Sequence, residues 1–166
     1  MPNTFIAFNG AMPTTAALTP VTTGTAVKTL LQIATPATCE LRVSEWGISF
    51  DGFAAAAPIK VELIDTNVAA TVTAHVTAGV TPLNDTGTVA SKMTLGTTAT
   101  GYTATAEGSI TAARILDYQQ IAPTGQFVKQ WPLGLEPELA VSRFLRVRVT
   151  AAAAVNAICY VVWTEA

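Results

Sequence analysis

The sequence predicts an all-β fold: two antiparallel sheets packed as a jelly-roll-like sandwich, with about eight strands and very little helix. Three observations lead to this prediction. Several short segments alternate apolar and polar residues with the period of two that a half-buried strand requires. Turn residues, mainly proline, glycine and asparagine, separate these segments. No amphipathic pattern at helical spacing extends beyond a few turns.

The first residues differ in composition from the rest. Residues 1–24 are rich in threonine, alanine and proline and are expected to form an N-terminal arm, followed by one sandwich domain over residues 25–166. Three large apolar residues of the arm need burial on the domain or on a neighbour: Phe5, Ile6 and Phe8. We expect residues 1 to about 20 to be ordered only through a neighbouring protein chain, and to be dispensable for folding.

Three strands are expected in the first half of the domain, at Val27 to Ile33, Cys39 to Phe50 and Ile59 to Ile64. In the second of them the alternation changes phase part-way along. This change requires either a β-bulge near Glu45 to Gly47, where glycine permits a positive φ, or two separate strands joined by a kink.

The Thr- and Ala-rich residues 68–111 favour strands over helices because of their β-branched content. Thr81 to Gly87 is expected to form a long turn. Ile110 to Ile121 fits a strand or an irregular helical turn, and its context favours the strand. The strands expected in this half are Ala70 to Val76, Gly101 to Thr105, Ile110 to Ile121 and Phe127 to Trp131.

The last two strands are expected at Phe144 to Thr150 and Ala157 to Thr164. In the first, one face is aliphatic and predicts a core, whereas the other face, with Phe144, Arg146 and Arg148, is expected to meet water or a partner. The second is apolar on both faces, which predicts a central strand covered on both sides. We expect the two to pair as an antiparallel hairpin.

Charge and hydropathy exclude several classes of protein. Only 12% of residues are charged, about half the roughly 25% of an average domain. The formal net charge of -2 gives no general basic field, so no nucleic-acid partner is expected. No apolar run approaches the roughly 20 residues of a membrane span, and the first residues lack a signal-peptide pattern. We therefore expect no membrane partner, and a protein made and folded in a cytoplasm.

Cysteine usage also bears on the fold. Cys39 and Cys159 lie in strand-like sequence, where buried free thiols are favoured over a disulfide in a reducing compartment. An immunoglobulin-like sandwich is the alternative fold. The spacing of the two cysteines, and the position of Trp46 close to Cys39, do not fit the usual pattern of that family.

The sequence offers little catalytic chemistry. The single histidine, His75, is expected to be a packed or surface residue rather than a catalytic or metal-binding one. No nucleophile elbow or phosphate-binding glycine loop appears, and the eleven carboxylates are scattered singly. Asp65 to Asn67 and Asn84-Asp85 match turns as well as calcium ligands and are interpreted as turns. We expect no enzymatic activity, no cofactor and no metal.

Three motifs resemble small all-β structural proteins of tailed phages: Trp131 to Gly134, Ser142 to Val149 and Tyr160 to Glu165. A looser similarity extends through Trp46 to Phe50. Such proteins are capsid decoration, or cement, proteins that sit as trimers on the outside of a head shell. The resemblance implies a homotrimer on the virion exterior whose partner is the major capsid protein.

A few residues are candidates for an oligomer or capsid interface because arginine and aromatic side chains are enriched at interfaces. These candidates are Phe5, Ile6, Phe8, Arg143, Phe144, Arg146 and Arg148. The alternative for the arginines is a salt bridge within the chain, for example to Glu40 or Glu62. A carbohydrate- or receptor-binding module of a virion is the alternative function. A host-surface glycan would then need exposed aromatic residues, with Tyr118 and Trp131 as candidates and core packing as their alternative role.

Overall fold

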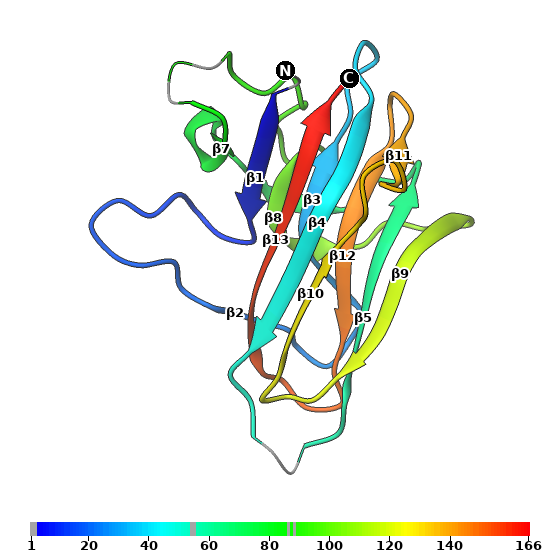
Figure 1. Ribbon diagram of the computed structural model, residues 1–166. Coiled ribbons are helices and arrows are strands. Elements are labelled where there is room, and N and C mark those ends of the chain that lie inside the picture. The colour runs from blue at the N-terminus through cyan, green and yellow to red at the C-terminus, as the bar shows by residue number, and fades with distance from the viewer. Residues whose placement is uncertain (1–2, 54–55, 86, 88) are drawn as a thin grey trace.

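Two antiparallel sheets pack face to face as a β-sandwich (Figure 1), which confirms the predicted fold class. The computed structural model describes residues 3–53, 56–85, 87 and 89–166. The described residues form thirteen strands and one 3-10 turn, η1 (Thr77–Gly79). The number of strands exceeds the expected eight because several short edge strands join the main ones. None of the described residues forms a helix long and apolar enough to cross a membrane.

One sheet has seven strands, and its main path runs in the order β10, β4, β13, β1, β7, while β11 pairs with β4 and β2 pairs with β13. Their bounds are β1 (Thr4–Phe8), β2 (Val21–Thr22), β4 (Leu41–Phe50), β7 (Val80–Pro82), β10 (Gln126–Gln130), β11 (Glu138–Leu139) and β13 (Asn156–Glu165). This sheet holds both the N-terminal strand and the C-terminal strand of the described chain.

The other sheet has six strands in the order β6, β8, β3, β12, β5, β9. Their bounds are β3 (Lys28–Ala34), β5 (Ile59–Thr66), β6 (Thr71–Ala74), β8 (Gly101–Ala106), β9 (Ala113–Ile121) and β12 (Phe144–Thr150). The consecutive strands β3, β4 and β5 alternate between the two sheets, as expected for a jelly-roll-like sandwich. The strand interpretation of residues 110–121 is confirmed by β9.

The expected C-terminal hairpin is wrong. Strand β12 pairs with β3 and β5 in the six-stranded sheet, whereas β13 pairs with β4 and β1 in the seven-stranded sheet. The connection between them crosses from one sheet to the other, and its residues Ala151 and Val155 are buried. The two strands therefore lie in opposite sheets, and each buries its aliphatic or apolar inner face in the core between the sheets.

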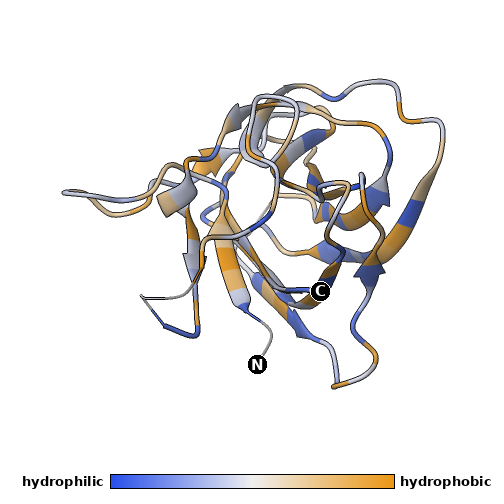
Figure 2. Ribbon diagram, turned by 90° about the horizontal axis from the view of Figure 1, so that it is seen from above, coloured by the Kyte–Doolittle hydropathy of each residue, from blue (hydrophilic) through white to orange (hydrophobic). Residues whose placement is uncertain are grey.

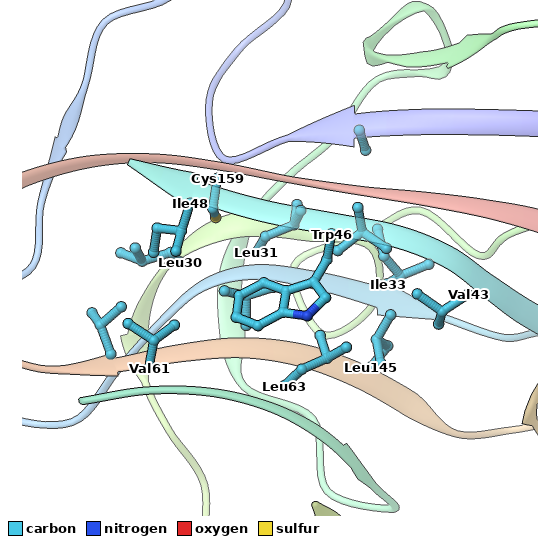
Figure 3. Close-up of a cluster of buried hydrophobic side chains, with 14 of the residues drawn as sticks. Leu30, Leu31, Ile33, Val43, Trp46, Ile48, Val61, Leu63, Leu145 and Cys159 are labelled. Carbon is cyan, nitrogen blue, oxygen red and sulfur yellow. The ribbon is translucent and has the colours of Figure 1, made fainter. Parts of the chain in front are cut away.

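Trp46 lies at the centre of that core (Figure 3). Its side chain is fully buried, with Leu63 and Leu145 of the six-stranded sheet on one side and Ile48 and Cys159 of its own sheet on the other. The indole Nε1–H donates a hydrogen bond of 3.1 Å to a carboxylate oxygen of Asp117 on β9. A buried tryptophan needs such a partner. This bond therefore also fixes β9 against the core.

Of the two alternatives for this stretch, β4 shows the β-bulge, one residue before the expected range Glu45 to Gly47. Val162 of β13 pairs with Glu45 and Trp163 with Val43, so Ser44 is the additional residue and β4 continues as one strand. Gly47 does not adopt the positive φ that the prediction assigned to it. Its role is steric, because a Cβ at Gly47 would lie 2.6 Å from the ring of Tyr160.

The N-terminal arm differs from the expectation. Strand β1 pairs with β13 on one side and β7 on the other, and both Phe5 and Ala7 are fully buried. The prediction that residues 1 to about 20 are ordered only by a neighbouring chain is therefore wrong for β1, which belongs to the sandwich of its own chain. Residues 1 and 2 of the expected arm lie outside the described residues.

Two smaller expectations concern the middle of the chain and the cysteines. The turn predicted over Thr81 to Gly87 starts later, since Thr81 and Pro82 belong to β7, and residue 86 lies outside the described part. Cys39 and Cys159 are both buried and free, as favoured by the sequence. Burial raises the pKa of both thiols, which keeps them protonated and unreactive.

Candidate interaction surface

The outer face of the seven-stranded sheet carries a group of apolar side chains. Along β13, the side chains that point into the core are Ala157, Cys159, Val161 and Trp163. The alternate residues Ile158, Tyr160 and Val162 point to the outside and are only half-buried. Strands β1, β13 and β4 lie side by side across the front of the molecule in Figure 1. This sheet face is therefore exposed to solvent.

The strand register aligns further apolar residues with those of β13. Val128 of β10 lies opposite Gly47, Gly47 lies opposite Tyr160, and Tyr160 lies opposite Phe8 of β1. Phe8 is 38% and Val128 57% exposed. We call the resulting group the apolar strip. It consists of Ile6, Phe8, Val128, Ile158, Tyr160 and Val162.

Tyr160 is the centre of the strip and is held there by three contacts. Its ring lies over Gly47, where the missing side chain makes room for it. The Phe8 ring packs against it at 5.7 Å between centroids. The phenol donates a hydrogen bond of 2.5 Å to the carboxylate of Glu45. Burial, with Glu45 beside it, raises the pKa of Tyr160 to about 12, so the strip keeps a neutral phenol at neutral pH.

A loop projects from the edge of this sheet. Residues 10–20, between β1 and β2, extend away from the sandwich in both Figure 1 and Figure 2. We call these residues the projecting loop. Nearly all of them are exposed, and the first charged residue of the whole chain is Lys28. Leu18 folds back onto Gly10, where a Cβ would lie 2.6 Å from its methyl group, so the base of the loop is closely packed.

Two hollows meet at Phe8. One, of about 220 Å³, lies on the strip between Phe8, Gln126, Val128 and Tyr160. The other, of about 280 Å³, lies between Phe8 and the inner side of the projecting loop, which contributes Met12 and Leu18 among others. Because Phe8 lines both hollows, the strip and the inner side of the loop form one continuous surface.

His75 holds the backbone of Phe8 in place. The imidazole is 4% exposed, packs edge-on against Tyr102 and donates a hydrogen bond of 2.8 Å from Nε2 to the Phe8 carbonyl oxygen. It is therefore a packed histidine, as expected from the sequence. Burial lowers the pKa of His75, and only the bond to Phe8 opposes this effect.

The His75 environment predicts a loss of stability in mild acid. The unfolded chain, with a histidine pKa of about 6.5, takes up a proton before the folded chain does, so the free energy of unfolding falls as the pH falls from 6.5. We expect urea midpoints to decrease between pH 7 and pH 5. The His75→Gln variant is expected to have a flatter profile over this range, and an equal slope in both proteins would contradict the assignment.

A second apolar feature lies on the loop between β10 and β11. Leu133 is 98% and Leu135 69% exposed. The turn that carries them is well ordered by hydrogen bonds: Leu135 N–H donates to the Pro132 carbonyl at 3.0 Å, and Gly134 N–H donates to the Glu136 carboxylate at 2.6 Å. We call Leu133 and Leu135 the leucine tip. Along the sheet, the polar pair Gln130 and Glu45 separates the tip from Val128 of the strip.

The remaining interface candidates do not join the strip. Phe5 of β1 is fully buried in the core, and the others lie on β12 or just before it, in the other sheet. Each arginine is paired within the chain: Arg143 with Asp65 at 2.8 Å, Arg148 with Glu62 at 2.8 Å, and Arg146 with Glu107. The alternative interpretation, a salt bridge to Glu62, is confirmed for Arg148. Phe144 is half-buried.

Arg146 contradicts the expectation that the outer face of its strand meets water or a partner, since its side chain is 0% exposed. It is covered by two loops, one after β5 at Val68 and one after β8 at Glu107. Arg146 donates hydrogen bonds to the Val68 carbonyl at 3.2 Å, to the Glu107 carbonyl at 3.1 Å and to the Thr29 hydroxyl at 2.7 Å, besides its ion pair with the Glu107 carboxylate. Arg146 therefore holds these two loops against the six-stranded sheet.

The two aromatic residues proposed for glycan binding lie apart from the strip. Tyr118 is 46% exposed and pairs with Glu62, which places it on the outer face of the six-stranded sheet. Trp131 packs against the core, with Lys129 Nζ 5.1 Å from its ring centroid. Neither lines the two hollows at Phe8. For Trp131 the structure supports the packing role.

The turn expected at Asp65 to Asn67 is wrong for its first two residues, because Asp65 and Thr66 belong to β5 and only Asn67 lies beyond the strand. Asp65 accepts hydrogen bonds from Arg114 and Arg143, and the Asn84 side chain accepts one from the Thr4 backbone. Within the described ranges, no group of three or more His, Cys, Asp or Glu residues is arranged to hold a metal ion.

Comparison with known proteins gave no match among family models, curated proteins or solved structures. Ile6 and Phe8, two of the candidates from the sequence, belong to the strip, whereas Val128, Ile158, Tyr160 and Val162 were not among the candidates. The available signal was the apolar second face of the last strand, which was interpreted as covered by another layer.

Proposed function

We propose that this protein is a non-enzymatic structural component of a tailed-phage virion, which decorates the outside of the capsid and stabilises it by bridging major capsid subunits. The motifs that resemble decoration proteins suggest the class. The observation that carries the proposal is the presence of two separate apolar surfaces, the strip and the leucine tip, on one sandwich. A trimer that bridges capsid subunits needs one surface for contact between its own subunits and another for the capsid.

The two surfaces suit assembly with other proteins. Single exposed apolar residues are common on soluble proteins, but grouped ones mark contact sites. The tip is held by hydrogen bonds, so little conformational entropy is lost when it docks. A trimer would carry three tips, and linking weak sites raises the overall affinity by roughly 100 to 10,000-fold without a strong single contact.

The direct test uses undecorated heads of the phage that encodes the chain. The purified protein is expected to sediment with the heads and to raise the temperature at which they rupture. A protein that does not bind, or that binds without raising the rupture temperature, would refute the decoration role.

Replacing both tip leucines by serine is expected to weaken head binding at least tenfold. Burial of one leucine is worth about 2 kcal/mol, and about 1.4 kcal/mol corresponds to a factor of ten. The matched control is Ile115→Ser, which removes an aliphatic side chain of 61% exposure from β9. Co-sedimentation measures the binding of both variants to heads, and circular dichroism verifies that both variants fold. Equal binding by the double variant and the control would exclude the tip as the capsid contact.

The alternative function is a carbohydrate- or receptor-binding module of a virion, favoured by the exposure of Tyr118. A glycan array separates it from the decoration role. Specific glycan binding that is lost in Tyr118→Ala would support the alternative, whereas no glycan binding together with head stabilisation would leave the decoration role.

A further inference from the structure

The apolar strip and the projecting loop match each other in chemistry. Residues 10–20 contain no charged side chain, and the strip itself contains none. The carboxylate of Glu45, beside the strip, already accepts a hydrogen bond from the Tyr160 hydroxyl. Contact between the two surfaces would therefore bury mainly apolar groups, and the carboxylate beside them is hydrogen-bonded.

We propose that these surfaces form the contact between copies of this chain: the projecting loop of one subunit packs across the apolar strip of the next. The loop points away from the sandwich in Figures 1 and 2, so it does not lie on the strip of its own subunit. Each subunit then gives its loop to one neighbour and receives the loop of another on its strip, a head-to-tail contact that closes into a ring when the rotation between neighbours divides a full turn. The inference rests on the proposed function for the number of subunits, which is three.

The size of the strip supports the participation of the loop. Four strands about 4.8 Å apart and five residues at about 3.3 Å each span roughly 200 Å², whereas a stable interface needs about 800 Å² from each partner. Two strips packed face to face would therefore be too small. In a ring each subunit contributes both its loop and its strip, and Phe8 joins the two into one band.

A matched pair of charge substitutions tests the contact by light scattering at micromolar concentration. The unaltered protein is expected at about three times the 17.2 kDa of one chain. Val128→Glu places a charge on the strip at a position of 57% exposure and is expected to reduce the mass threefold. Ile115→Glu, at 61% exposure on the other sheet, is expected to remain trimeric. A monomeric unaltered protein, or a trimeric Val128→Glu, would overturn the proposal.

Cysteine cross-linking tests the head-to-tail arrangement. Thr15 in the loop and Gln126 beside the strip are both exposed, and the natural cysteines are buried. Under mild oxidation the Thr15→Cys/Gln126→Cys double variant is expected to give a covalent ladder up to the trimer, whereas each single variant stays uncrosslinked. Dimers from Gln126→Cys alone would indicate strips packed face to face, and the absence of a ladder would equally refute the contact.

These outcomes are independent of the test with heads. A trimer with the expected cross-links that fails to bind heads would refute the decoration role and leave the subunit contact intact. A monomer that binds and stabilises heads would refute the subunit contact alone.

Discussion

Replacing Phe5 by alanine is expected to lower the free energy of unfolding by about 4 kcal/mol, the usual cost of removing a phenylalanine from a close-packed core. The side chain is fully buried, and its ring lies 6.1 Å from that of Trp163, centroid to centroid. Strand β1 lies between β13 and β7, so the cavity left by the substitution has sheet on both sides and cannot collapse easily. Urea unfolding measures the effect.

Phe8→Ala is the control, because it also replaces a phenylalanine by alanine, but on the opposite face of β1. Phe8 is 38% exposed, and we expect a loss of about 1 kcal/mol or less. Both variants should be measured at a protein concentration low enough to give monomers, since association raises the apparent stability. If Phe5→Ala lowered the free energy of unfolding as little as Phe8→Ala, or if the chain still folded after deletion of residues 2–20, β1 would be a dispensable arm.

The second large effect is expected for Glu107→Ala, at about 3 kcal/mol, because it leaves the buried guanidinium of Arg146 without its counter-ion. Burial already lowers the pKa of Arg146, and Glu107 is the main group that opposes this effect. The substitution also removes the acceptor of the Thr29 N–H and hydroxyl. Thermal and urea unfolding are expected to agree on the loss.

Glu138→Ala is the matched control. It removes the carboxylate from the Arg42–Glu138 pair, in which the side chains are 48% and 55% exposed. Exposed pairs contribute between 0 and about 1 kcal/mol, so a small change is expected there. If the two alanine variants were equally stable, Arg146 would not act as a buried anchor.

Local periodicity predicted which residues share a face, and this part of the fold agrees with the structure. The aliphatic face of β12 lies in the core, and the phase change in β4 is a bulge. Periodicity does not determine which strand pairs with which. Residues 144–150 and 157–164 looked like a hairpin because they are adjacent in sequence, but each completes a different sheet.

Periodicity also does not determine what covers a face. The outer face of β12 carries arginines and was expected to meet water or a partner, yet Arg146 is buried beneath the backbone at Val68 and at Glu107. The outer face of β13 is apolar and was expected to be covered, yet it forms the apolar strip. In both cases the deciding contacts involve residues far apart in the sequence, which no window of neighbouring residues contains.

The position of β1 has a consequence for the synthesis of the protein. Asn9, at the end of β1, exchanges hydrogen bonds with Cys159 of β13, which is 150 residues later in the chain. On the ribosome, β1 therefore has no partner on this side until β13 has emerged. Phe5 therefore stays without its core neighbour Trp163 until β13 has been synthesised. Nascent chains that stop before β13 are expected to depend on chaperones to avoid aggregation.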